Sequence, residues 1–260
     1  MKYFYSLIGS LILVVAVYLL GVQFNWYGDL EPAGSSVADV YPRNLVENKG
    51  KAQEEFMPGA KQILFGDTHV HTSYSTDAFL WSLPILNGEG PHPISDACDY
   101  ARFCSAIDFW VTTDHAEASS PRKWQEIKEA VRQCNAPADE EDPDMVTFLG
   151  FEWTQVGRRA NDHFGHKNVM FLDIEEGKTP KRPIGAGGLA TVGMRQTLGS
   201  SAEQFKPLAV LDFKNRHRYF NFIEFGKELS GVPYCEEGVS SDLLPADCYE
   251  SAVTPQDLYT

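Results

Sequence analysis

Histidine and carboxylate side chains lie beside several apolar runs of this chain. Neutral imidazole and carboxylate are the usual ligands of Zn²⁺, Mn²⁺ and iron, so a cluster of them would bind a divalent ion. In the motif His69-Val70-His71 the two imidazoles are two residues apart, and on a strand they would face the same side and bind one ion together. The candidate metal ligands are His69, His71, Asp77, His115, Glu152 and His166.

Other polar residues near these motifs have predicted supporting roles. Glu152 lies between two aromatic residues, which favours a buried carboxylate that needs a partner. Glu152 and Asp114 are the catalytic candidates, and Asp114 and Asp67 are expected to orient the histidines. His163 is a candidate contact behind the ligands, and His92, in a Gly- and Pro-rich loop, is a candidate substrate contact.

The apolar pattern predicts alternating strands and helices. This order is typical of βαβ units with a parallel sheet, so the sequence predicts an α/β fold. In such folds the carboxyl ends of the strands lie along one rim, where ligands bind. The candidate ligands should therefore meet at that rim. The predicted strands are 62–66, 107–113, 145–151 and 168–172, and the predicted helices are 93–105 and 121–134.

The remaining segments give weaker signals. Residues 24–61 lack periodicity and predict a linker, and the alternation disappears over 173–254. The aromatic stretch 216–225 indicates packing or an interface. The Gly-rich stretch 185–199 lacks the lysine of a phosphate-binding loop. Residues 254–257 have the pattern of a helix start close to the last residue, which suggests a piece of a longer protein. The expected divisions are 1–23, 24–61 and 62–260.

Residues 1–23 are mostly apolar. Nineteen residues from Phe4 to Val22 carry no charge, which nearly suffices to span a bilayer. Lys2 precedes them, and the first charges after them are Asp29 and Glu31, an asymmetry that favours an inside N-terminus and an outside body. A cleaved signal peptide is the alternative to a signal anchor. Either alternative places the body at the periplasmic or extracellular face.

Charge narrows the choice of partners. The formal net charge is −14, whereas nonspecific nucleic-acid binding needs a basic surface. A bound cation can dominate the local field, so a small anionic substrate stays compatible with this charge. The sequence thus predicts a small-molecule substrate, no nucleic acid, and membrane contact through the N-terminal segment.

Five cysteines fit an oxidising compartment. Cys104 and Cys134 end two consecutive predicted helices that should lie side by side, and a disulfide is expected between them or with Cys98 in place of Cys104. Cys235 and Cys248 flank an acidic loop and form a second candidate pair. Reduced, buried thiols are the alternative.

The motifs "GDTHVHTSYSTD", "VTTDHAE", "GFEWT" and "GHKNVMF" resemble those of the PHP (polymerase and histidinol phosphatase) superfamily. They resemble more closely an exported, uncharacterised bacterial branch that is catalogued as a domain of unknown function. The resemblance implies a distorted seven-stranded β/α barrel, of which this chain would supply the N-terminal half. It also implies a two- or three-metal site that hydrolyses phosphoesters. It assigns a first metal to His69 and His71, a second to His166, a third to Asp77 and His115, and a bridging position to Glu152.

An exported metal-dependent hydrolase is therefore the expected function, most simply a phosphoesterase that uses a metal-activated water. Two or three Zn, Mn or Fe ions are the expected cofactors. An amidohydrolase-like enzyme acting on C–N bonds is one alternative, although such barrels add a bridging lysine that the sequence does not place. A non-catalytic binding module stabilised by metal is the other alternative.

Overall fold

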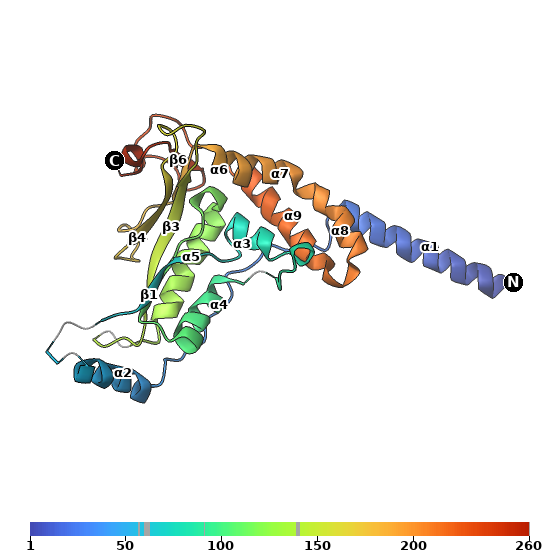
Figure 1. Cartoon of the computed structure of the whole chain (residues 1–260). Coiled ribbons are helices and arrows are strands. Elements are labelled where there is room, and N and C mark those ends of the chain that lie inside the picture. Colours follow the sequence, from blue (N-terminus) through green and yellow to red (C-terminus); the bar gives the residue numbers. More distant parts are fainter. Residues whose placement is uncertain (57, 60–62, 91, 139–140, 260) are drawn as a thin grey trace.

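The computed structural model describes residues 1–56, 58–59, 63–90, 92–138 and 141–259. They form a mixed α/β body from which one long N-terminal helix, α1 (Lys2–Gln23), projects (Figure 1). The described part of the chain has one helix that is long and apolar enough to cross a membrane, and it is α1. Residue 62, with which the first predicted strand begins, lies outside the described residues.

The central sheet has four strands in the order β1-β2-β3-β4. The first three pair in parallel, as expected, but β4 is antiparallel to β3. The expectation of a purely parallel sheet is wrong for β4. A parallel partner needs a crossover of a dozen or more residues, and the connection 156–164 is shorter than that. The strands are β1 (Gly66–Val70), β2 (Phe109–Thr112), β3 (Val146–Gln155) and β4 (Gly165–Phe171).

The sheet is curled into a half-barrel. Its two outer strands approach each other across the concave side, where the side-chain amide of Asn168 on β4 donates to the carbonyl of Thr68 on β1 at 2.8 Å. Residues 63–65, predicted as part of the first strand, precede β1 and are exposed. The strand begins at Gly66, so His69 lies within it and His71 just after it.

Two helical segments cover the convex side of the sheet (Figure 1). Helix α4 (Ile94–Asp99) continues into a π-helical turn, η2 (Tyr100–Ser105), and α5 (Pro121–Asn135) starts at its predicted cap. The Ser120 hydroxyl accepts from the Lys123 amide at 3.2 Å. These helices and the sheet enclose a core that includes Trp110, Trp124 and Trp153.

The segment 173–254, in which the sequence shows no alternation of strands and helices, forms a helical layer with its own core. Its longest helix, α9 (Arg216–Gly231), buries Phe220, Phe222 and Phe225, which confirms packing as the role of the aromatic stretch. Phe79 of α3 (Thr76–Trp81) belongs to the same core. The layer also contains α6 (Leu189–Thr191), η4 (Val192–Thr197), α7 (Leu198–Ser201), η5 (Ala202–Phe205), α8 (Lys206–Leu211) and η6 (Phe213–Asn215).

The segment predicted as a linker is partly folded. It contains α2 (Arg43–Phe56), and the Lys49 ammonium of this helix pairs with Asp108 at 2.5 Å. The backbone amide of Tyr41 donates to Asp144 at 2.7 Å. Residues 41–49 are therefore attached to the body, close to the start of β2.

Two disulfides stabilise the body. Cys98 pairs with Cys134 and joins α4 to α5, whereas Cys104 is free and exposed. The expected Cys104–Cys134 bond is thus wrong, and the Cys98 alternative holds. Six residues along a helix turn the side chain to a different face, so Cys98 and Cys104 cannot both face α5. Cys235 pairs with Cys248.

A small second sheet lies beside the layer. It consists of β5 (Ile184–Ala186) and β6 (Glu250–Ala252), which pair in parallel. The short helix α10 (Pro255–Leu258) follows it and starts at Thr254, as predicted. Thr254 and Asp257 cap each other reciprocally, which was not predicted from the sequence. Two short helical turns complete the described elements: η1 (Pro84–Leu86) and η3 (Ala116–Ala118).

Candidate metal centre

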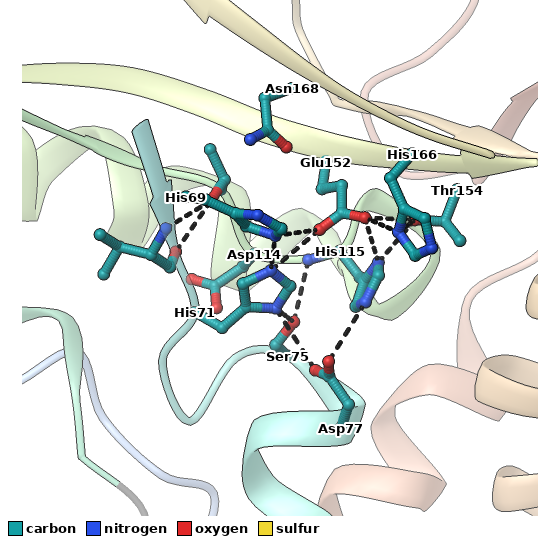
Figure 2. A network of polar contacts seen from close by, with 12 residues as sticks. His69, His71, Ser75, Asp77, Asp114, His115, Glu152, Thr154, His166 and Asn168 are labelled. Atoms are coloured by element: carbon teal, nitrogen blue, oxygen red, sulfur yellow. Dashed lines mark hydrogen bonds and ion pairs between the residues drawn. The ribbon is translucent and has the colours of Figure 1, made fainter. Parts of the chain in front are cut away.

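The curled sheet brings the predicted ligands together at one rim. His69 lies near the end of β1, His115 follows β2, and Glu152 lies on β3, opposite His115 in a backbone bridge. His166 was predicted just before the fourth strand but lies within β4, opposite Thr154. It meets Glu152 because an antiparallel strand starts where its partner ends. Figure 2 shows these side chains converging on the Glu152 carboxylate.

Three donor atoms form a first cluster. His69 Nε2, His71 Nε2 and Glu152 Oε2 lie 2.9 Å from one another in each pairing. Ion–ligand distances of about 2.0–2.2 Å place ligands that subtend a right angle at the ion about 3 Å apart. Two imidazole nitrogens and one carboxylate oxygen at these separations could therefore bind a divalent cation.

A second cluster shares His71. Asp77 Oδ1 lies 3.4 Å from His71 Nδ1, and Asp77 Oδ2 lies 3.4 Å from His115 Nε2. The Ser75 hydroxyl lies 2.8 Å from His71 Nδ1. The Nδ1 partners fix the ring orientation that directs Nε2 towards Glu152, as second partners of metal-bound histidines do.

The two oxygens of Glu152 face different partners. Oε2 belongs to the first cluster, whereas Oε1 contacts His166 Nδ1 and accepts from the Thr154 hydroxyl at 2.8 Å. His115 Nδ1 lies 3.9 Å from Oε1. Glu152 is fully buried, so these contacts replace its hydration. A carboxylate held this way can bridge two ions.

The close charges shift the titration of the site. Burial disfavours the charged imidazole of His71, but hydrogen bonds with Asp77 and Glu152 outweigh burial and raise the pKa of His71 to about 9. Burial also lowers the pKa of His115, but the carboxylates of Asp77 and Glu117 outweigh burial and raise the pKa of His115 to about 10. Burial raises the carboxyl pKa values of Glu152 and Asp77, yet the neighbouring imidazoles hold both well below their usual range. The carboxylates are therefore ionised and available as ligands at neutral pH.

Three predicted residues lie outside the cluster. Both oxygens of buried Asp114 accept from Thr72, at 2.6 and 2.8 Å, so this carboxylate fixes the turn after His71 and does not point at the donor atoms. Asp67 accepts from the backbone amide of His69 at 2.9 Å. His163 is exposed, and its Nδ1 lies 3.3 Å from the Gly157 carbonyl, away from the donors.

Four residues at the site were not predicted. Ser75 and Thr154 contact the ligands directly, and Asn168 tethers β4 to β1. Glu117 is fully buried. Thr154, Glu117 and Asn168 each follow a predicted ligand by two residues, a spacing that places residues of a strand on one face and could have identified Thr154 and Asn168.

Glu117 stands behind His115. Its Oε1 accepts from the amides of Thr154, at 3.0 Å, and Ala186, at 2.6 Å. Its Oε2 lies 3.5 Å from His115 Nδ1, without hydrogen-bond geometry to any described residue. A buried carboxylate beside an imidazole favours the ring orientation and the basicity that metal binding requires.

A cavity of about 620 Å³ opens beside the cluster. His69 and His71 form one part of its wall, and His92, Tyr100 and Trp110 form another. His92, the candidate substrate contact, pairs with Asp96 at 3.3 Å at the cavity wall. The cavity is large enough for a small molecule to reach the donor atoms.

One family model matches part of the chain. It is described as "Protein of unknown function (DUF3604)" and matches residues 58–120. No curated protein and no solved structure matches the chain. The matched segment runs from before β1 to the cap of α5, and it contains His69, His71, Asp77 and His115. The chain is therefore similar to this family over the segment that supplies the first two strand ends of the candidate metal centre.

Proposed function

We propose that the chain is an exported metal-dependent hydrolase that acts on phosphoesters with water as the nucleophile. The observation that carries the proposal is the position of Glu152, a fully buried carboxylate whose two oxygens face imidazoles from different strands. Such a centre suits two neighbouring divalent ions, and the resemblance of the motifs to the PHP superfamily agrees with it. The ion type expected from imidazole and carboxylate donors is Zn²⁺, Mn²⁺ or Fe.

The donor groups supply the binding part of the chemistry. His69, His71 and Glu152 would hold the first ion, and Asp77 and His115, together with His71, would hold the second, with His166 beside Glu152 Oε1. When bound, the ions would acidify a water molecule and neutralise the oxygens of an anionic substrate. That local positive field explains how a chain of net charge −14 can accept a phosphoester.

The protein's other groups keep the site in place. The Thr154 hydroxyl donates to Glu152 Oε1, and Ser75 and Asp77 hold the His71 ring. The cavity next to His69 gives the substrate an approach from the side of β1. Lys167, the lysine next to His166, donates to the carbonyl of Phe164 and is therefore occupied away from the donors, which weakens the amidohydrolase alternative.

Turnover tests this proposal. Purified full chain would be stripped of metal, reloaded with Mn²⁺, Zn²⁺ or Fe²⁺, and assayed on p-nitrophenyl phosphate, bis-p-nitrophenyl phosphate and an N-acyl amide. Metal-dependent release of nitrophenol that disappears in Glu152→Gln and persists in His163→Ala is expected. Amide cleavage alone would favour the C–N hydrolase, and metal binding without turnover would favour a binding module.

We further propose that α1 is a signal anchor that leaves the body at the periplasmic or extracellular face. Two disulfides in the body support an oxidising compartment. The full chain, including α1, would be fused after its last residue to a reporter. An alkaline phosphatase reporter should be active, and a fluorescent protein that folds only in the cytoplasm should be dark. The reverse pair of results would contradict the orientation.

A further inference from the structure

The helical layer has a tip that lies along the end of α1. The tip comprises residues 206–218, which are α8, η6 and the first turn of α9 (Figure 1). Tyr18 of α1 donates to the Ala209 carbonyl at 3.4 Å, and its ring lies 5.5 Å from that of Phe213. Lys206 donates to the Gln23 carbonyl at 2.6 Å. The tip therefore contacts α1 before the helix ends.

The contact between the tip and α1 extends well back from the C-terminal end of the helix. A crevice of about 440 Å³ separates α1 from the tip, and its wall runs from Leu13 to Tyr18 on α1 and includes Phe213 and Arg216 on the tip. At about 1.5 Å per residue, Leu13 lies about 15 Å below the last residue of α1. A helix of this length that crosses a hydrocarbon core of about 30 Å places that stretch inside the bilayer. An inserted α1 thus brings the tip level with the outer leaflet of the bilayer.

The tip has the composition of a membrane-contact surface. Leu211 is 82% exposed and Phe213 is 57% exposed, although both are apolar. Phe24 and Trp26, directly after α1, are exposed as well, as aromatic residues at the bilayer interface are. A water-exposed patch of this kind needs an apolar partner.

The charge of the tip is opposite to that of the whole chain. Residues 206–218 carry four basic side chains and one acidic one, whereas the chain has a net charge of −14. The Arg216 guanidinium lies over the Phe213 ring at 4.1 Å, at the mouth of the crevice. Basic groups beside apolar ones suit the phosphates of an anionic lipid surface.

We propose that the tip docks on the outer surface of the bilayer beside α1, with Leu211 and Phe213 entering it and Lys214 and Arg216 contacting phosphates of anionic phospholipids. This proposal rests on the anchoring proposed for α1 and is independent of the metal centre. Two attachments, α1 and the tip, would fix the angle of the body to the membrane.

Fluorescent labelling of the full chain tests the docking. In a Cys104→Ser background, one reporter cysteine would be placed at Leu211 (the tip), Leu11 (the anchor) or Leu172, a 93% exposed leucine that follows β4. Each variant, labelled with an environment-sensitive nitrobenzoxadiazole dye, would be reconstituted in phosphatidylcholine–phosphatidylglycerol vesicles. Labels in Leu11→Cys and Leu211→Cys should shift to shorter emission wavelength. The label at residue 211 should be quenched by lipids with a nitroxide high on the acyl chain, and the label at residue 11 by lipids with a nitroxide deep in the acyl chain. The label in Leu172→Cys should show neither effect.

The outcomes separate the two proposals. Quenching at residue 11 but not at residue 211 would overturn the docking and leave the anchor intact, and no quenching at either would overturn both. A blue shift at 211 without lipid quenching would also overturn the docking, since it indicates contact between chains. Lys214→Glu/Arg216→Glu should lose most quenching at 211 in anionic vesicles, whereas Lys178→Glu/Lys181→Glu should keep it; equal quenching in both pairs would contradict the role of the basic groups.

Discussion

His71 and Glu152 meet at 2.9 Å between Nε2 and Oε2, and the other nitrogen of the same imidazole faces Asp77. This one ring therefore belongs to both donor clusters. A histidine after β1 and a glutamate on β3 come into contact because the sheet curls and places their strand ends on one rim.

Removing His71 should affect metal binding more than removing any other ligand. In His71→Ala both donor clusters lose a member, so retained metal per chain after dialysis should fall close to zero, as measured by elemental analysis. His69→Ala affects one cluster only and should lower the affinity for one ion by more than about 100-fold. Even loss of a residue that only hydrogen-bonds a ligand lowers metal affinity about 10–100-fold. His163→Ala is the matched control and should retain the wild-type metal content. Loss of metal in the control as large as in His71→Ala would contradict the assignment.

Glu117 should matter for metal affinity although it is no candidate ligand. Glu117→Gln keeps an acceptor for the amides of Thr154 and Ala186 but removes the negative charge next to His115. Metal affinity should fall about 10-fold, and Glu117→Asp should recover part of it. Calorimetric titration of the metal-free chain measures the change. Glu129→Gln, an exposed glutamate on α5, serves as control, and an unchanged affinity in Glu117→Gln would refute the role.

The Cys98–Cys134 bond should be a major source of stability. It closes a loop over a sequence separation of 36, for which the loss of chain entropy in the unfolded state is worth about 3–4 kcal/mol. Cys98→Ser should lower the free energy of unfolding by about that amount in denaturant titrations, and Cys104→Ser should leave it nearly unchanged. Peptide mapping without reductant checks the pairing directly. A Cys104–Cys134 peptide in the map would show that the disulfide has been misassigned.

Lys123 should make stability depend on pH. Its side chain is fully buried over the Phe225 ring, and burial lowers the pKa of Lys123 to about 7. The unfolded chain, with a lysine pKa of 10.5, binds more protons between pH 7 and 10.5, so this group makes stability rise with pH across that window and imposes its full cost below pH 7.

Lys123→Met should therefore stabilise the chain at pH 6.5. The gain is on the order of 3 kcal/mol after the lost hydrogen bond to the Ala118 carbonyl, and it should shrink as pH approaches 10.5. Urea titrations of both proteins at pH 6.5, 8 and 9.5 measure the difference, with exposed Lys178→Met as control. A gain that is independent of pH would show that Lys123 is not responsible.

Local sequence was sufficient for much of the site. The spacing of His69 and His71, the caps at Ser120 and Thr254 and the apolar stripe of α5 depend on neighbours along the chain, so each could be predicted from the sequence. The strands next to His115 and Glu152 were likewise identifiable, because short apolar runs between helical segments indicate buried strands. The third strand was predicted to end before Glu152, whereas β3 continues to Gln155. These signals identified the candidate ligands without the fold.

Other features depended on contacts between distant segments, which no local pattern encodes. The antiparallel direction of β4 brings His166 to Glu152, and the choice of Cys98 over Cys104 depends on which helix face meets α5. The same holds for the tip against α1, where residues nearly two hundred positions apart touch. Such pairings depend on the free energy of the whole folded chain, whereas the candidate ligands could be recognised from residue types and spacing in the local sequence.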